Sequence, residues 1–143
     1  MTNADALKNA IDAENAAIFT YGVTTAFIGP AERGTVAEFI ADHRIRRNEL
    51  NDDLTAAGGG TEPPAPGYDL PTPVTDPKSS ATVLLAAEED CARAYRAMLE
   101  QVDDAGLRRR AVDALTSSAK RSAHWRGVLG QSPATVPFPG QPS

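Results

Sequence analysis

The chain has 143 residues and a net charge of −5, and 41% of its residues are hydrophobic although only 6% are aromatic. This length suits one domain with a single core, and few aromatic residues beside many alanines are more typical of a helical protein than of an all-β one. The negative charge argues against a surface for nucleic acid or for an anionic membrane, and a single cysteine excludes an intrachain disulfide.

No targeting or membrane segment is visible in the sequence. The first residues lack the basic patch and apolar core of a signal peptide. The longest apolar run, residues 81–87, is interrupted by a threonine and is too short to cross a bilayer. We therefore expect a cytoplasmic protein.

The first predicted helix spans residues 3–28. Apolar residues recur in steps of three and four from Leu7 onward, which is typical of a helix packed inside a bundle. The pair Gly29 and Pro30 ends it, because a helix interior does not tolerate this pair. Glu14 occupies one position of the apolar seam. A buried carboxylate without a partner is costly, so Glu14 predicts polar partners on other helices.

The second predicted helix spans residues 33–57, carries His43 and Arg47 on its seam, and ends at three consecutive glycines. Residues 58–76 are rich in glycine and proline and cannot form a helix or a central strand. In polyproline form this segment reaches roughly 60 Å, which exceeds the roughly 36 Å length of a helix of about 24 residues. It is long enough to cross from one end of a bundle to the other. The alternative, a flexible linker, would leave two halves too small for their own cores.

The third and fourth predicted helices span residues 77–103 and 105–129. Asp76 and Pro77 form a cap followed by proline at the first helical position, and Gly130 ends the fourth helix. Residues 131–143 contain several prolines and form an irregular tail. The sequence therefore predicts an all-α, single-domain four-helix bundle over residues 1–143, with two antiparallel hairpins joined by one long crossover, which is ferritin-like connectivity.

Several polar side chains lie on the predicted inner faces at a similar height. Counting residues from the helix ends places one glutamate from each of two helices and one histidine from each of the other two within roughly 6 Å along the bundle axis. Arginines on the inner faces would neutralise the carboxylates, and tyrosines would add hydroxyl groups. The alternative is that one or more of these side chains lies at the edge of the apolar face of its helix and reaches water. The predicted core network consists of Glu14, Tyr21, His43, Arg47, Glu88, Tyr95, Arg121 and His124.

This pattern resembles the ferritin-like di-metal carboxylate proteins, in which two helices supply a Glu and the other two supply Glu-x-x-His. The chain departs from that pattern at Ile40 and Arg121, which stand three residues before the two histidines. Residues 14–22, 43–47, 68–71 and 123–127 carry a closer resemblance, which covers nearly the whole chain, to the actinobacterial ferritin-like domain of unknown function. That resemblance implies the fold and leaves the activity open.

The resemblance raises the possibility of a metal site, and the residues argue against one. A di-iron centre usually needs about four carboxylates, and only two remain here. A guanidinium about 5 Å from a divalent ion repels it by roughly 6 kcal/mol at an effective dielectric constant of about 20. We therefore predict a degenerate site without a cofactor. The alternative is a metal-dependent oxidoreductase that binds iron, manganese or zinc through Glu14, His43, Glu88 and His124.

These observations predict a non-catalytic structural or interaction protein. An apolar outer face formed by Phe19, Val23 and Phe27 indicates a homodimer that pairs through the first two helices. A small-molecule binder that uses a cavity beside Glu14 is a third hypothesis. The arginines near residues 44–47 and 108–110 are more typical of solvated helix faces than of phosphate sites. Cys91 is expected to be a buried small hydrophobe.

Overall fold

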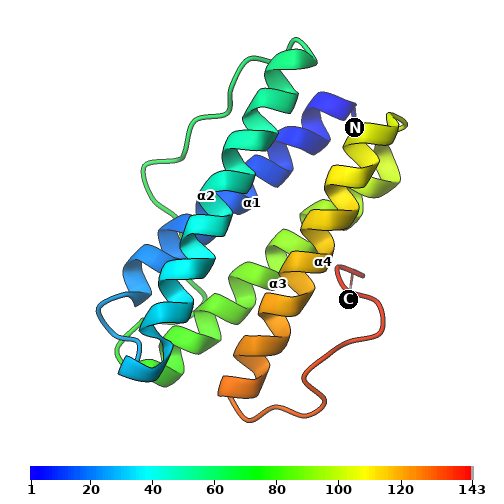
Figure 1. Cartoon of the computed structure of the whole chain (residues 1–143). Helices are drawn as coiled ribbons and strands as arrows, with labels where there is room; N and C mark the ends of the chain where they lie inside the picture. Colours follow the sequence, from blue (N-terminus) through cyan, green and yellow to red (C-terminus); the bar gives the residue numbers. More distant parts are fainter. Residues whose placement is uncertain (143) are drawn as a thin grey trace.

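The structure is a computed structural model that describes residues 1–142. Within that range it contains four long α-helices, one short 3-10 helix and no strand (Figure 1), which confirms the predicted all-α fold. The helices are α1 (Asn3–Thr24), α2 (Arg33–Ala56), α3 (Pro77–Gln101) and α4 (Ala105–Val128), and the 3-10 helix η1 (Pro30–Glu32) precedes α2. None of these helices is both long and apolar enough to cross a membrane.

The observed boundaries reflect local capping chemistry. Helix α1 begins with a capping box between Thr2 and Asp5, and α3 begins with a similar box at Asp76. Helix α1 ends at Thr24, although the sequence predicted residue 28. The hydroxyls of Thr24 and Thr25 both donate to the Tyr21 carbonyl, and such side-chain bonds compete with the helical backbone pattern. The other three helices end within two residues of the predicted positions.

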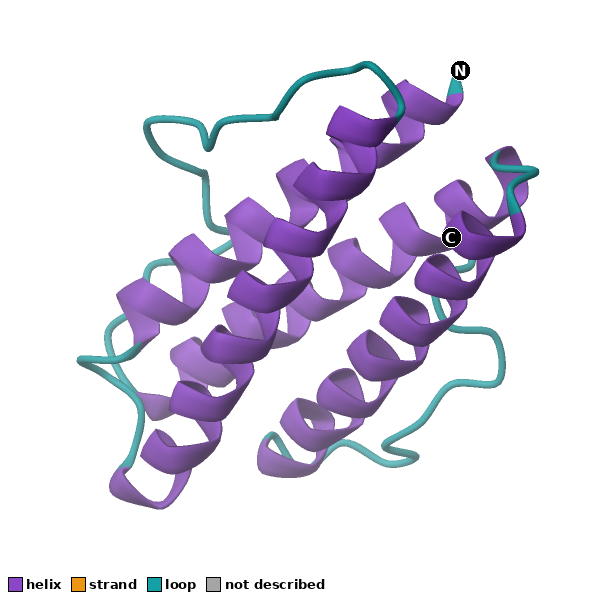
Figure 2. Ribbon diagram, turned by 45° about the horizontal axis from the view of Figure 1, so that its top comes forward, coloured by secondary structure: helices purple, strands orange, loops and turns teal. Residues whose placement is uncertain are grey.

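Two antiparallel hairpins build the bundle (Figure 2). Helix α1 packs against α2 and α3, and α3 packs against α4, whereas α2 and α4 touch at only a few positions. The apolar core forms two clusters, one around Leu7, Leu50 and Met98 and one around Leu84 and Trp125. On α1, α2 and α3 the buried polar residues Glu14, His43 and Glu88 lie close to the boundary between the two clusters. A polar layer therefore crosses the bundle at mid-height.

The segment between α2 and α3 runs along the outside of the bundle from the end of α2 to the start of α3 (Figure 1). The Tyr68 ring packs on Phe19 of α1 with a centroid distance of 5.6 Å, and the Glu62 amide donates to the Asn51 side chain of α2 at 2.8 Å. These contacts attach the crossover to the first hairpin. Because the crossover is long enough to return the chain to the other end, α2 and α3 run in the same direction.

The segment after α4 turns back along the second hairpin (Figure 1). Arg126 holds it near α4 by donating to the Ala134 carbonyl at 3.2 Å. Gly140 then approaches α3 so closely that a Cβ atom there would lie 2.3 Å from the Ala92 carbonyl oxygen, and its φ of +76° is one that side chains rarely adopt. This contact therefore requires glycine.

Candidate functional site

The polar layer at the centre of the bundle receives side chains from all four long helices. Helix α1 contributes Glu14 and Tyr21, α2 contributes His43, α3 contributes Glu88 and Tyr95, and α4 contributes Arg121 and Trp125. All of these side chains are buried, and Arg121, at 8%, is the most exposed of them. Six belong to the network predicted from the sequence. Each reaches the layer because it occupies a seam position that helical periodicity turns toward the neighbouring helices.

His43 joins the two buried carboxylates. Its Nδ1 is hydrogen-bonded to Glu14 Oε1 and its Nε2 lies 2.7 Å from Glu88 Oε2. An imidazole can donate from both nitrogens only when it is protonated. Burial by itself lowers the pKa of His43, but the charges of Glu88 and Glu14 outweigh burial and raise this pKa to about 9. His43 is therefore an imidazolium at neutral pH.

Glu88 is the most heavily bonded member of the layer. It accepts hydrogen bonds from the Tyr21 hydroxyl at 2.6 Å and from Arg121 Nε at 3.0 and 3.2 Å to its two oxygens. Burial raises the pKa of this carboxyl, but the charges of His43 and Arg121 and the hydrogen bond from His43 more than offset that effect and hold the pKa below its usual range. Glu88 is thus an ionised carboxylate with cationic partners on two sides.

Two tyrosines complete the layer. Tyr95 donates its hydroxyl to Glu14 Oε2, and Tyr21 accepts a hydrogen bond from Trp125 Nε1 at 2.8 Å. Burial, together with the neighbouring carboxylates, raises the pKa of both phenols well above the ordinary value, so both stay neutral and donate. With both oxygens engaged and no exposed surface, Glu14 offers no contact to a small ligand.

Two residues of the predicted network lie outside it. Arg47 is half-buried and its Nε donates to the neighbouring Asn48 side chain at 3.2 Å. His124 is 34% exposed and its Nε2 lies 2.7 Å from Glu32 Oε2 near the start of α2. Residues four apart share a helix face, so Trp125, four residues after Arg121, takes the inward position. The prediction that Arg47 and His124 join the core is therefore wrong.

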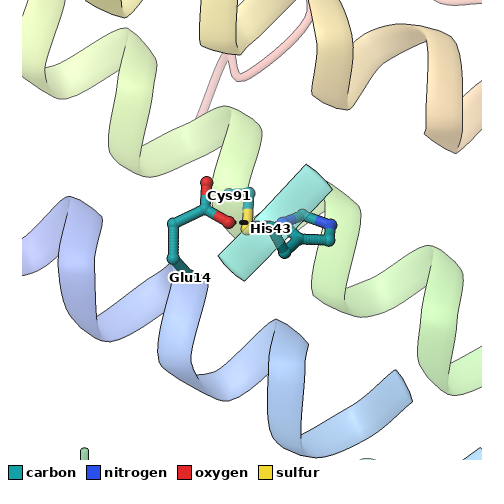
Figure 3. Close-up of side chains that lie close together, drawn as sticks. All are labelled: Glu14, His43 and Cys91. Atoms are coloured by element: carbon teal, nitrogen blue, oxygen red, sulfur yellow. Dashed lines mark hydrogen bonds and ion pairs between the residues drawn. The ribbon is translucent and has the colours of Figure 1, made fainter. Parts of the chain in front are cut away.

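The structure also brings Cys91 next to Glu14 and His43. From the sequence, Cys91 was expected only to be a small hydrophobic residue of the core. A ligand atom of each residue lies within 4.8 Å of the other two (Figure 3). The thiol donates to the Ala13 carbonyl with an Sγ–O distance of 3.5 Å. Burial and the nearby carboxylates raise the pKa of Cys91 well above the ordinary value, so it is a protonated thiol. The only sequence signal was its position one turn after Glu88.

Residues 6–143 match the family described as a domain of unknown function, DUF4439. The chain belongs to this family. It is also similar to a crystal structure of a conserved hypothetical protein, rv2844, from Mycobacterium tuberculosis. The two are 35% identical, the TM-score is 0.86, and the match covers 89% of this chain and 96% of that one. A search of curated proteins gave no match.

More distant solved structures define the wider fold of this DUF4439 chain. Dps from Listeria monocytogenes is 13% identical with a TM-score of 0.80, covering 93% of this chain and 96% of that one. A structure described as ferritin-like, diiron-carboxylate proteins from Bacillus anthracis str. Ames is 14% identical with a TM-score of 0.72, covering 89% and 94%. At these identities the likeness shows the fold alone. The predicted ferritin-like four-helix bundle is therefore confirmed.

The donor set of the DUF4439 chain does not fit a pair of iron ions. Its polar layer offers two carboxylates and one imidazole, and each carboxylate oxygen already accepts a hydrogen bond from His43, Arg121 or a tyrosine. Among residues 1–142 the buried side-chain atoms without a partner belong to Asn15, Ser118 and Ser122, none of which is in the layer. The layer is a closed set of donors and acceptors, with two cations facing two carboxylates.

Proposed function

We propose that this chain is a ferritin-like domain with a structural or protein-interaction role, in which buried ion pairs stabilise the centre of the bundle in place of metal ions. The observation that supports this is the contact between Arg121 and Glu88. The guanidinium donates to both oxygens of the carboxylate, at the place where the di-metal pattern has a third carboxylate. A cation at that position both satisfies Glu88 and repels a metal ion.

Metal analysis of the purified protein tests this proposal. The full chain is incubated with iron(II), manganese(II) or zinc, desalted, and measured by mass spectrometry for metal content and by calorimetry for thermal unfolding. We expect less than a stoichiometric amount of each metal and an unchanged unfolding temperature. Retention of stoichiometric metal, together with a higher unfolding temperature, would contradict the proposal, because a ligand that binds only the folded state stabilises it.

A second candidate is a single divalent ion at Glu14, His43 and Cys91, which would support the alternative of a metal-dependent oxidoreductase. Carboxylate, imidazole and thiolate are all zinc ligands, and the three groups converge. Binding would require His43 and Cys91 to lose protons, and both have raised pKa values. Cobalt(II) distinguishes the candidates, because a thiolate–cobalt bond gives a near-ultraviolet absorption band that Cys91→Ala would remove. We expect no such band in the wild-type protein.

We also propose a homodimer that pairs through α1 and α2. Phe27 is 41% exposed after α1 and Ile45 is 58% exposed on α2, which supports an apolar contact surface there. The expected surface is smaller than the sequence indicated, because Tyr68 covers part of Phe19. Sedimentation at micromolar concentrations should give a dimer, and Phe27→Glu should give a folded monomer. A wild-type monomer would contradict this part of the proposal.

We propose in addition that residues 1–143 act as one domain, which the family match over residues 6–143 supports.

We propose a cytoplasmic location, which the single free and buried cysteine supports. We propose an actinobacterial family, which the relative from Mycobacterium tuberculosis supports.

A further inference from the structure

A groove of about 670 Å³ lies between α3, α4 and the segment after α4. Its floor on α4 consists of the short side chains of Thr116, Ala119 and Ala123, and its outer wall is formed by residues 135–142. This volume is within the range of about 300–1,000 Å³ that is typical of small-molecule sites. The groove shares none of its lining residues with the central polar layer, so it is independent of the structural role proposed for that layer.

The outer wall of this groove is apolar. Val136 and Phe138 line the groove and are 44% and 64% exposed. An occupant with an apolar body would cover these side chains.

The charged side chains at the rim of the groove indicate which polar group the ligand carries. Arg126 is paired with Glu89 at 2.9 Å, and Arg93 is paired with Asp90. Lys120 also lines the groove, is exposed, and makes no ion pair within the described residues. A cation without a partner beside an apolar groove, on a chain whose net charge is −5, favours an anionic head group on the occupant.

We propose that this groove binds a small amphipathic anion, with its apolar body between α4 and Phe138 and its anionic group at Lys120. Residues 135–142 act as one wall of the site. The hydrogen bond from Arg126 to the Ala134 carbonyl and the close approach of Gly140 to Ala92 keep this wall in position.

Fluorescence titration of the full chain tests this proposal. The probe is 1-anilinonaphthalene-8-sulfonate, an aromatic anion, and dodecanoate is the competitor that represents an aliphatic anion. We expect saturable binding at one site per chain and displacement by dodecanoate, with displacement by the neutral dodecanol weaker by about two- to fivefold, the effect of one exposed ion pair. Absence of saturation up to about 1 mM of probe would overturn the proposal. Equal displacement by dodecanol would overturn the part assigned to Lys120.

Two variants locate the binding site. Ala123→Trp fills the groove and should abolish binding, whereas Ala41→Trp on the exposed surface of α2 should leave it unchanged. Lys120→Glu should weaken binding about two- to fivefold, the effect of one exposed ion pair. The matched charge reversal Arg109→Glu lies on the same helix outside the groove and should have no effect. Undiminished binding to folded Ala123→Trp would overturn the proposal. If the tryptophan variant does not fold, the test rests on Lys120→Glu, because a substitution at this exposed position should not disturb folding.

Discussion

Two groups of charged side chains connect α2 and α4, and they differ in their exposure to water. In the central layer His43 and Arg121 meet Glu88, and at most 9% of any of these side chains is exposed. In the outer group, Arg110 of α4 binds Asp53 and Glu49 of α2, and these side chains are 19–35% exposed. Arg110 donates to both oxygens of Asp53, at 2.8 and 3.2 Å. The outer group therefore has hydrogen-bond geometry as favourable as that of the buried one.

Removal of one partner should affect the two groups very differently. At the outer site water solvates the remaining charge, so the loss is small. At the central site water has no access, and the remaining charge stays buried without compensation. Comparable hydrogen bonds should therefore contribute very different amounts to the free energy of unfolding.

The largest expected effect comes from His43→Ala. It removes the cation between two buried carboxylates, so we expect destabilisation near the upper end of about 3–5 kcal/mol. Chemical denaturation followed by circular dichroism measures the change. Arg44→Ala, at the next and exposed position of α2, is the matched control and should change stability by less than about 0.5 kcal/mol. Equal stability of the two variants would show that His43 does not carry charge in the core.

Arg121→Ala should have the next largest effect, about 3 kcal/mol. It leaves Glu88 with His43 as its remaining cationic partner, which explains a smaller loss than in His43→Ala. The same denaturation experiment measures it, with Arg109→Ala as the exposed control on α4. A variant that unfolds like wild type would mean that Glu88 does not depend on the guanidinium.

The stability of the wild-type protein should depend on pH through the central layer. The folded-state pKa of His43 is about 9 against 6.5 for the free side chain, so its contribution is fully present below pH 6.5 and is lost as pH rises toward 9. The pKa of Glu88 is lowered from 4.5, so its contribution is present above that pH and is lost as pH falls through the folded value. Denaturation midpoints measured from pH 3 to 10 should be highest between about 4.5 and 6.5.

A His43→Gln variant separates this effect from other titrations. The decline of stability above pH 6.5 should be weaker in this variant, because glutamine does not titrate. An identical decline in wild type and variant would mean that groups other than His43 cause the loss of stability above pH 6.5.

The smallest expected effect is that of Arg110→Ala, below about 1 kcal/mol. Asp53 and Glu49, whose side chains are 19% and 35% exposed, regain water when the guanidinium is removed. Salt sharpens this test, because sodium chloride at about 1 M screens exposed charges strongly and buried ones little. The difference between wild type and Arg110→Ala should shrink in salt, while that between wild type and Arg121→Ala should persist. A loss as large as that of Arg121→Ala would remove the distinction between the two groups.

The sequence by itself determined the helices, the crossover and most of the central layer. Apolar periodicity, caps such as Asp76 and the glycine and proline run at 58–76 are local signals, and local hydrogen-bonding and steric rules are enough to interpret them. Glu14, His43 and Glu88 were recognisable because a charged residue inside an apolar seam needs a partner, whatever the partner is.

Only the tertiary structure decided which polar residues share the layer. Spacing alone does not show which arginine, Arg47 or Arg121, enters the layer, or which histidine, His43 or His124. A helix can rotate about its axis by a few tens of degrees and keep the same apolar residues on its inner face. The packing of Trp125 on Tyr21 orients α4 so that Arg121 faces Glu88 and His124 reaches Glu32. The groove beside α4 was equally hidden, because it depends on where residues 134–142 return, and an irregular segment has no periodicity from which its path can be predicted.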